Sequence, residues 1–550
     1  MSWLSRYRFL SIYVCVIFFL VCLPLFSTQA MVTENQDILF HMNRIEGIKE
    51  GLIAGQFPVR IHAYQLDGYG YPCGYFYPDL FLYFPAVLRL LGIPMGTAYN
   101  LFLLSLNVLT WGVSYYAFSW LFRHRYPGML AACFYLTCGY RILDVFVRGA
   151  MGEILAMAFL PLAFVSVYEV LFHQSKQWYW IVLSFTCILQ SHLLSGWMCC
   201  AYAVGMLVVA VLCKKDIPWE KIGQTVLWVL GLNLWFYFPF FALYRQWDLN
   251  IQHALFPIQQ EGLSGYEVVL YLMLTDLFLL MGWFLYLLSR WMGKTEQKSY
   301  LTPCVVLSVL LSLMVLRSFP WDMLSYLPVF GIFVRSLQFP LRLWEIASVC
   351  FSIIAAAGAW FWIRQGGERK KLVVLTVFFL TGAYFQAQVV QLYPYTLERD
   401  EAIPSSNRRS IGYQADYLSY GLDEHVVECL SSDFVMEDKG KDNVVAIRKR
   451  GSTIEMNYDA AVDTAGTAAL LYYPGYVAKD EDGIPLPVYE NSRHLLEVQL
   501  PAGQHHVKIS YAGLMKYHLA EIFSLLVFVF FCRRLWGERR RIRMIWSEIP

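Results

Sequence analysis

Long apolar runs recur along the chain, separated by short polar segments. About twelve of them approach the roughly 20 residues that an α-helix needs to cross a bilayer. They lie near residues 9–27, 97–121, 128–146, 153–172, 178–192, 195–213, 222–243, 267–289, 303–317, 339–363, 371–391 and 515–532. We interpret the first run as an uncleaved helix, because it is longer than the apolar core of about 7 to 15 residues in a signal peptide.

A different pattern occupies residues 393–513. Short runs there alternate apolar and polar positions, as in Ile454, Met456 and Tyr458, and turn signals such as Asp482-Gly483 separate them. Alternation with a period of two is typical of half-buried strands. The sequence therefore predicts an all-α polytopic membrane module over residues 1–392, a small β-sandwich over 393–513, and a last helix with a basic tail over 514–550.

Basic residues test this arrangement, because cytoplasmic loops of membrane proteins are enriched in Lys and Arg. The apolar stretch 78–93 contains Pro85 and Arg89 and is short for a crossing, so we interpret it as lying along the outer interface. With the N-terminus inside, the segments assigned to the cytoplasm are all basic: 123–125, 173–176, 214–221, 290–298, 364–371 and the tail from 533. This topology places a first loop, residues 28–96, and the predicted β-sandwich outside the cell membrane.

Composition agrees with the membrane class and excludes others. Hydrophobic residues make up 58% of the 550 residues and charged residues 15%, whereas soluble domains have roughly 25% charged residues. A net charge of +2 gives no electrostatic reason to expect nucleic acid as a partner. The 13 cysteines include no CxxC pair, so they predict no zinc framework.

Charged residues gather in the first predicted outer loop. On a helix, Asp37, His41 and Arg44 fall at positions i, i+4 and i+7 and share one face, and Glu34 lies one turn earlier. Ile38 and neighbouring apolar residues form an adjacent stripe. The pattern fits either an interfacial helix with a solvated polar face or a site just above the lipid headgroups.

A second group lies at the outer end of the third predicted span. Arg141, Asp144 and Arg148 fall at i, i+3 and i+7, and Glu153 opens the next helix. Ionisable groups at membrane depth cost on the order of 3 kcal/mol each, so they usually pair or serve a site. A functional site and a purely structural ion-pair cluster both remain open.

A third group begins the tenth predicted span, where Arg335, Gln338 and Arg342 fall at i, i+3 and i+7. His192 ends the fifth span at the same level, either as a helix cap or as a participant in the site. A carboxylate can accept the proton of an attacking hydroxyl, and arginines can stabilise a phosphate leaving group. These residues therefore indicate transfer from a lipid-phosphate sugar, since soluble nucleotide sugars are unavailable outside.

With these residues in view, the chain resembles the GT-C class of membrane glycosyltransferases, and more narrowly the YfhO-like bacterial membrane proteins. The resemblance lies in "QDILFHMNRIEGIKEGLIAGQFPVRI", "YPCGYFYPDLFLYFPAVLRLLGI", "YRILDVFVRGAMGEILAMAFLPL", "VRSLQFPLRLWEIAS" and "YYPGYVAKDEDGIPLPVY". It covers nearly the whole chain.

The resemblance implies an inverting, polyprenyl-phosphate-sugar-dependent transferase in the bacterial cytoplasmic membrane, acting on an envelope polymer or glycolipid outside. It implies that Asp37 is the catalytic base and that Glu153 orients the acceptor or holds a metal. Arg148, Arg335 and Arg342 are implied contacts of the donor phosphate, and the tail domain is implied in acceptor recognition. A divalent cation, Mg or Mn, stays open as a cofactor because Glu34 and Asp37 are not adjacent.

Two other function classes are compatible with the membrane pattern. A lipid-linked glycan polymerase or ligase also has about twelve spans, but the outer loop from 245 to 266 is short for one. A transporter or flippase calls for charges near the midplane. Asp276, inside the eighth predicted span, is the main residue that fits this last class. A non-catalytic scaffold is the remaining alternative.

Overall fold

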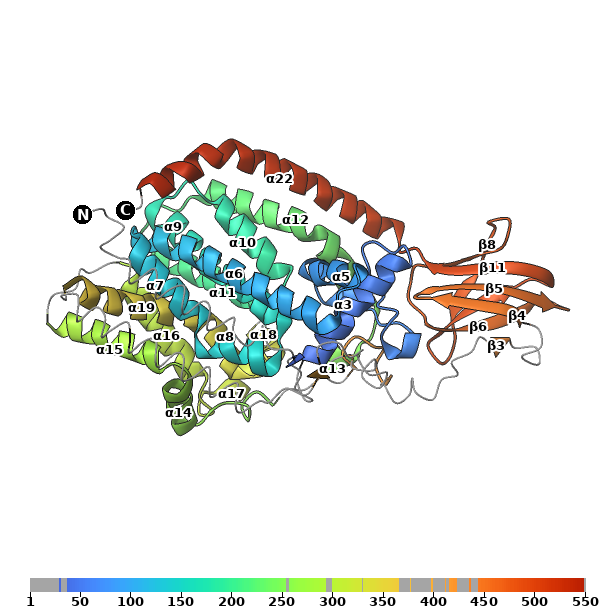
Figure 1. The fold of residues 1–550 in the computed structure, drawn as a ribbon, viewed down its shortest axis with the longest axis horizontal. Helices are drawn as coiled ribbons and strands as arrows, with labels where there is room; N and C mark the ends of the chain where they lie inside the picture. The colour runs from blue at the N-terminus through green and yellow to red at the C-terminus, as the bar shows by residue number, and fades with distance from the viewer. Residues whose placement is uncertain are drawn as a thin grey trace.

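The computed structural model describes residues 29–30, 37–253, 257–292, 299–328, 330–365, 376, 397–398, 411, 415–422, 435–436 and 444–548. The predicted first span, the eleventh span apart from residue 376, and Glu34 lie outside these residues. In Figure 1 a bundle of helices occupies one end of the molecule, and a β region projects beyond it at the other end. The predicted division into a helical part and a C-terminal β region is confirmed.

The helices of the first loop, which is predicted to lie outside the membrane, precede the bundle. They are α3 (Ile38–Ile53), α4 (Cys73–Phe76) and α5 (Tyr83–Leu90), with short 3-10 turns η2 (Leu66–Gly68) and η3 (Leu80–Leu82). The apolar stretch 78–93 thus forms only the eight-residue α5 and the turn before it, which together are too short to cross a bilayer.

The bundle follows in chain order. Its helices are α6 (Met95–Phe122), α7 (Arg125–Leu136), α8 (Gly139–Leu143), η4 (Asp144–Arg148), α9 (Met151–His173), α10 (Tyr179–Leu189), α11 (Leu193–Leu212), α12 (Trp219–Gln246), α13 (Asn250–His253), α14 (Gly265–Thr275), α15 (Leu277–Trp291), α16 (Leu301–Met314), α17 (Trp321–Ser325), α18 (Phe330–Ser336), η5 (Pro340–Leu343), α19 (Trp344–Gln365) and, after the β region, α22 (Met515–Glu548).

Within the described residues, five helices are long and apolar enough to cross a membrane: α6, α9, α11, α12 and η5 with α19. The number is up to seven if two bent pairs each form one span, α7 with α8 and η4 (42°) and α14 with α15 (97°). Several helices thus suit a multi-pass membrane protein, and the count of about twelve spans stays a prediction.

Helix α9 is the centre of the bundle. It packs against α6, α10, α11 and α19, and its residues from Met151 to Leu171 are all buried. A helix that is apolar all round is stable only when other helices surround it. Peripheral helices instead expose apolar side chains, such as Val204 and Val208 on α11 and Leu227 on α12, as expected where lipid is the solvent.

The β region is a two-layer sandwich. One sheet has the order β3-β6-β10-β9 and the other β4-β5-β11-β7-β8, and the paired strands are antiparallel. The strands are β3 (Val435–Met436), β4 (Val444–Arg450), β5 (Thr453–Ala460), β6 (Thr464–Leu471), β7 (Tyr476–Lys479), β8 (Pro485–Leu486), β9 (Val488–Glu490), β10 (Leu495–Leu500) and β11 (Gly503–Tyr511). A separate pair joins β1 (Gln29–Ala30) to β2 (Leu397–Glu398).

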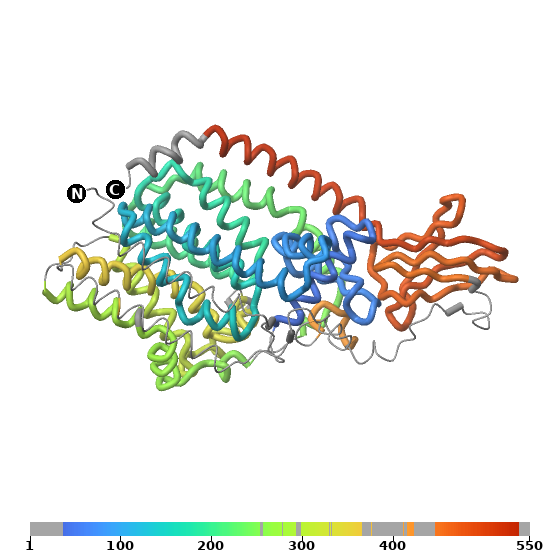
Figure 2. The backbone as a smooth tube through the Cα atoms, in the orientation of Figure 1, coloured from blue at the N-terminus to red at the C-terminus, as the bar shows by residue number. Residues whose placement is uncertain are grey.

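The alternation along each strand sends one set of side chains into the sandwich. Ile454, Met456 and Tyr458 of β5 share a buried core with Val498 of β10 and Ile509 of β11. The same core continues into the first loop, where Leu471 N donates to Tyr69 O at 2.9 Å. The β region is therefore packed on the first loop. Helix α22 then runs back along the bundle to the opposite end (Figures 1 and 2).

Candidate functional site

The first two charged groups of the sequence meet where α3 begins. Asp37 is the residue before α3, and its backbone N–H donates to the carbonyl of Arg148 at 2.9 Å. One carboxylate oxygen of Asp37 lies 4.0 Å from a terminal guanidinium nitrogen of Arg148. The start of the first-loop helix is thus attached to the turn that precedes the central helix α9.

Glu153, in the first turn of α9, is the centre of a buried cluster of ion pairs. Its Oε1 accepts from Arg148 at 3.1 Å and from Nε of Arg342 at 3.0 Å, and its Oε2 accepts from the hydroxyl of Tyr140 at 2.6 Å. Arg148 also donates to Asp144 at 2.5 Å. Two arginines therefore compensate two carboxylates that α9 and η4 bury.

Of the third charged group, Arg342 reaches Glu153 directly, Gln338 contacts Arg342, and Arg335 does not join the cluster. The terminal nitrogen Nη1 of Arg342 donates to Leu337 O at 2.9 Å and to the side-chain oxygen of Gln338 at 2.8 Å. The Phe339 ring lies under the guanidinium groups of both Arg148 and Arg342, 4.8 and 4.4 Å from its centroid. Arg335 is exposed, and its Nε donates to Gly331 O one turn earlier. The structure does not bring Arg335 to Glu153.

A second buried centre lies within the first loop. Arg44 donates to Asp79 at 2.6 Å and to Pro78 O at 2.7 Å, and it contacts Nδ1 of His41 at 2.9 Å. His62 Nε2 lies 2.9 Å from the other oxygen of Asp79. Burial alone would raise the pKa of Asp79, but Arg44 and His62 hold it below its usual value. This centre fixes α3 on the segment before α5.

Tyr77 connects the two centres. The guanidinium of Arg44 stacks 3.9 Å from the centroid of its ring. Its hydroxyl approaches Gly152 so closely that a Cβ there would lie 2.2 Å away. The first loop and the start of α9 are consequently in direct contact.

The remaining predicted site residues have structural contacts. Arg141 is fully buried and donates to Asn107 Oδ1 at 2.6 Å. His192 caps α11, because its ring Nδ1 accepts from Ser195 N at 3.4 Å. Ser195 donates in turn to Glu345 Oε2 at 2.8 Å. These contacts are those of a helix cap, which is one of the two alternatives that the sequence left open for His192.

Residues that the sequence did not single out complete the site: Asp79, His62, Tyr77 and Tyr140. Tyr140 stands next to Arg141 in the charged stretch, and Asp79 follows Pro78 at the start of an apolar run. An acidic residue next to a proline before an apolar run was the available signal for Asp79. Neither tyrosine had a local signal, because tyrosines are abundant throughout the chain.

Solvent exposure divides the cluster into a support and an accessible side. The Glu153 and Arg342 side chains are 2% and 4% exposed, whereas Arg148 is 21% and Asp37 is 55% exposed. Although the side chain is accessible, partial desolvation by the surrounding protein raises the pKa of Asp37 above its ordinary value. Arg148 opposes the rise, and Glu153 adds to it. Asp37 is thus an accessible carboxylate of raised pKa, and it lies beside the Arg148 guanidinium, which Glu153 holds in place.

Among the residues that the structure describes, the side chains around Glu153 do not form a ligand set for a divalent cation. Both oxygens of Glu153 already accept from arginine or tyrosine donors. Within the described parts of the chain, no group of three or more His, Cys, Asp or Glu side chains could hold a metal ion.

Gly149 allows α3 to approach the Arg148 turn. Its φ is +63°, and a Cβ would lie 1.8 Å from Cγ1 of Ile38. We expect Gly149→Ala to lower the free energy of unfolding by about 1 to 3 kcal/mol, through the disfavoured φ and the clash. Denaturant titration in detergent micelles measures the change. Gly205→Ala in α11 is the control, since nothing lies within 4 Å of its new Cβ; equal effects at both positions would contradict the close approach.

In comparisons with known proteins, no protein-family model and no curated protein matches the chain significantly.

Proposed function

We propose that the protein is a GT-C-like glycosyltransferase of the bacterial cytoplasmic membrane, which moves a sugar from a polyprenyl-phosphate donor to an acceptor outside the membrane. The observation that carries the proposal is the pair formed by Asp37 and Arg148. An exposed carboxylate of raised pKa lies 4.0 Å from a guanidinium, and the buried Glu153 cluster holds that guanidinium in place.

In the proposed reaction the acceptor hydroxyl attacks the anomeric carbon of the sugar. Asp37 takes the hydroxyl proton as the new carbon–oxygen bond forms. The bond between the anomeric carbon and the phosphate oxygen breaks, and the polyprenyl phosphate leaves with the bonding electrons. Attack from the face opposite the phosphate inverts the anomeric configuration.

Arg148 supports the departure of the phosphate. Its guanidinium is partly exposed and lies next to Asp37, where developing negative charge on a phosphate oxygen would be stabilised by a preorganised donor. Arg342 is almost fully buried and already donates to Glu153, Gln338 and Leu337. The proposal therefore gives Arg342 and Glu153 the role of positioning Arg148, and Arg148 the contact with phosphate.

A pH profile of sugar transfer tests the proposal. Membranes containing the protein receive radiolabelled undecaprenyl-phosphate sugars, and label in envelope polymers is counted. Because Asp37 must be ionised to accept a proton, transfer is expected to fall as pH decreases through its pKa, with the acid limb above the ordinary value of about 3.9. Absence of label with every donor would contradict the proposal.

A competing function, transport, draws its support in the sequence mainly from Asp276. This residue lies at the break between α14 and α15, where its Oδ1 accepts from Gly139 N at 2.7 Å and its Oδ2 from Thr275 at 2.9 Å. Both oxygens have partners within the protein. Asp276 therefore supports the bend of the helix pair better than it supports an ion pathway.

A further inference from the structure

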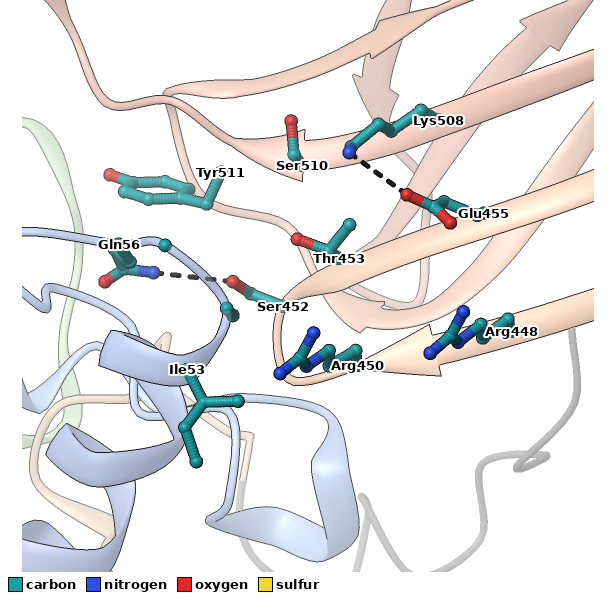
Figure 3. A pocket seen from close by; sticks show the side chains of 12 residues that line it. Ile53, Gln56, Arg448, Arg450, Ser452, Thr453, Glu455, Lys508, Ser510 and Tyr511 are labelled. Carbon is teal, nitrogen blue, oxygen red and sulfur yellow. Dashed lines mark hydrogen bonds and ion pairs between the residues drawn. The ribbon is translucent and has the colours of Figure 1, made fainter. Parts of the chain in front are cut away.

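A cavity of about 380 Å³ lies between the end of α3 and the outer face of the β region. Residues 53–56 of the first loop form one wall, and strands β4, β5 and β11 form the other. Figure 3 shows Arg448 and Arg450 on β4, Glu455 on β5 and Lys508 on β11. Three cations thus face the cavity against one carboxylate.

Strand register explains why these charges share a face. Arg448 lies directly opposite Glu455, Glu455 opposite Lys508, and Lys508 opposite Lys479 of β7. Directly opposed residues of antiparallel strands point to the same side of a sheet. Their neighbours Ile454, Met456 and Val507 point into the buried core. The sequence therefore aligns a row of charges across four strands, outside the sandwich.

The positive charges of this row outnumber its negative charges. Lys508 pairs with Glu455 at 3.0 Å, but the register also sets Lys508 opposite Lys479. Like charges directly opposite each other destabilise a sheet. Arg448 and Arg450 are exposed. An anion bound beside this row would relieve the repulsion and accept from the guanidinium groups, whose planar geometry matches phosphate oxygens.

The wall on the first-loop side is held in place. Gln56 donates to the hydroxyl of Ser452 at 3.4 Å, and its own oxygen accepts from Ile61 N at 3.0 Å. Tyr511 donates to Pro474 O at 3.1 Å and is also hydrogen-bonded to Tyr75 of the first loop. Ser452, Thr453 and Ser510 add hydroxyl groups to the lining. The cavity is consequently a preformed, polar and cationic pocket.

Helix α3 relates this cavity to the proposed active site. Asp37 precedes its first turn, and Ile53 at its last turn lines the cavity. At 1.5 Å per residue, 16 residues span roughly 24 Å. A ligand that reaches both places is therefore a chain, much longer than one lipid headgroup.

We propose that the cavity between α3 and strands β4, β5 and β11 binds phosphate groups of an anionic acceptor chain whose hydroxyl is presented to Asp37. This inference rests on the proposed function for the role of the chain, but binding by the cavity can be measured without transfer. The ligand chemistry is a phosphodiester or phosphomonoester, which an acceptor polymer or a phospholipid headgroup could supply.

The test uses the full-length protein in a neutral detergent and a fluorescent oligomer of six glycerol-phosphate units. Fluorescence anisotropy measures binding, with neutral dextran as the uncharged probe. We expect Arg450→Gln to weaken binding about tenfold, through loss of one charge-assisted contact, and to make its salt dependence shallower. Arg493→Gln, an exposed arginine between β9 and β10 of the other sheet, is expected to bind like the wild type.

Each result has a defined meaning. No preference for the oligomer over dextran, or equal binding by Arg450→Gln and the wild type, would overturn the anion site. Competition by monomeric dihexanoyl-phosphatidylglycerol or inorganic phosphate as strong as competition by unlabelled oligomer would overturn the assignment to a chain. Binding that persists in Asp37→Asn, together with no sugar transfer by the wild type, would support the cavity and contradict the proposed function.

Discussion

Asp37→Asn is expected to reduce the rate of sugar transfer about a hundredfold to ten-thousandfold, the usual contribution of a general base. Asparagine keeps the size of the side chain, but it cannot take the proton from the attacking hydroxyl of the sugar acceptor. The backbone N–H of residue 37 can still donate to Arg148 O, so α3 keeps its attachment. Label transferred from radiolabelled undecaprenyl-phosphate sugar to envelope polymer measures the effect.

The matched control for Asp37 is Asp322→Asn. Asp322 is exposed in the first turn of α17, and it is not part of the Glu153 cluster. The control is expected to transfer sugar at the wild-type rate. If Asp37→Asn incorporates as much label as the control, Asp37 is not the base, and the proposed reaction loses its proton acceptor.

Glu153→Ala is expected to lower the free energy of unfolding by about 3 to 5 kcal/mol. The change leaves Arg342 and much of Arg148 buried without their carboxylate, and removes the acceptor of the Tyr140 hydroxyl. Denaturant titration of the protein in detergent micelles measures the loss. Glu50→Ala, which breaks only a partly exposed pair with Lys49, is expected to cost less than about 1 kcal/mol.

A double-mutant cycle separates the ion-pair effect from simple loss of packing. If Glu153 and Arg342 are coupled, Glu153→Ala combined with Arg342→Met is expected to cost clearly less than the sum of the two single changes. Arg342→Met also removes the buried charge that Glu153 compensates. Additive effects would contradict the arrangement in which Glu153 holds the two arginines.

Helical periodicity in the sequence was enough to group Asp37 with Arg44, and Arg148 with Asp144. Residues that share one helix face are set by backbone geometry alone. Packing changed the interpretation of these groups. Arg44 pairs with Asp79, 35 positions away, in a stretch that reads as apolar, and Arg141 pairs with Asn107 inside the bundle. Helical periodicity predicts which residues of one helix are neighbours, but it does not predict which residues of other segments pack against them.

The alternating pattern of residues 444–511 was likewise a local signal, and it predicted the strands of the sandwich. The cavity beside it was not predictable from that pattern. It requires the pairing of β5 with β11, two strands separated by β6 to β10, and the approach of α3 from the first loop. Strand order depends on long-range packing, which periodicity does not encode.

Periodicity along the chain was enough to predict apolar helices, alternating strands, and acidic and basic residues on common helix faces, because these features follow from the repeat of the backbone. Long-range packing, in contrast, brings Glu153 to Arg342 across 189 residues, keeps Arg335 apart from them, and leaves Asp37 as an exposed carboxylate. Burial and pairing of charges depend on which distant segments pack together, since each buried charge is stable only opposite its partner.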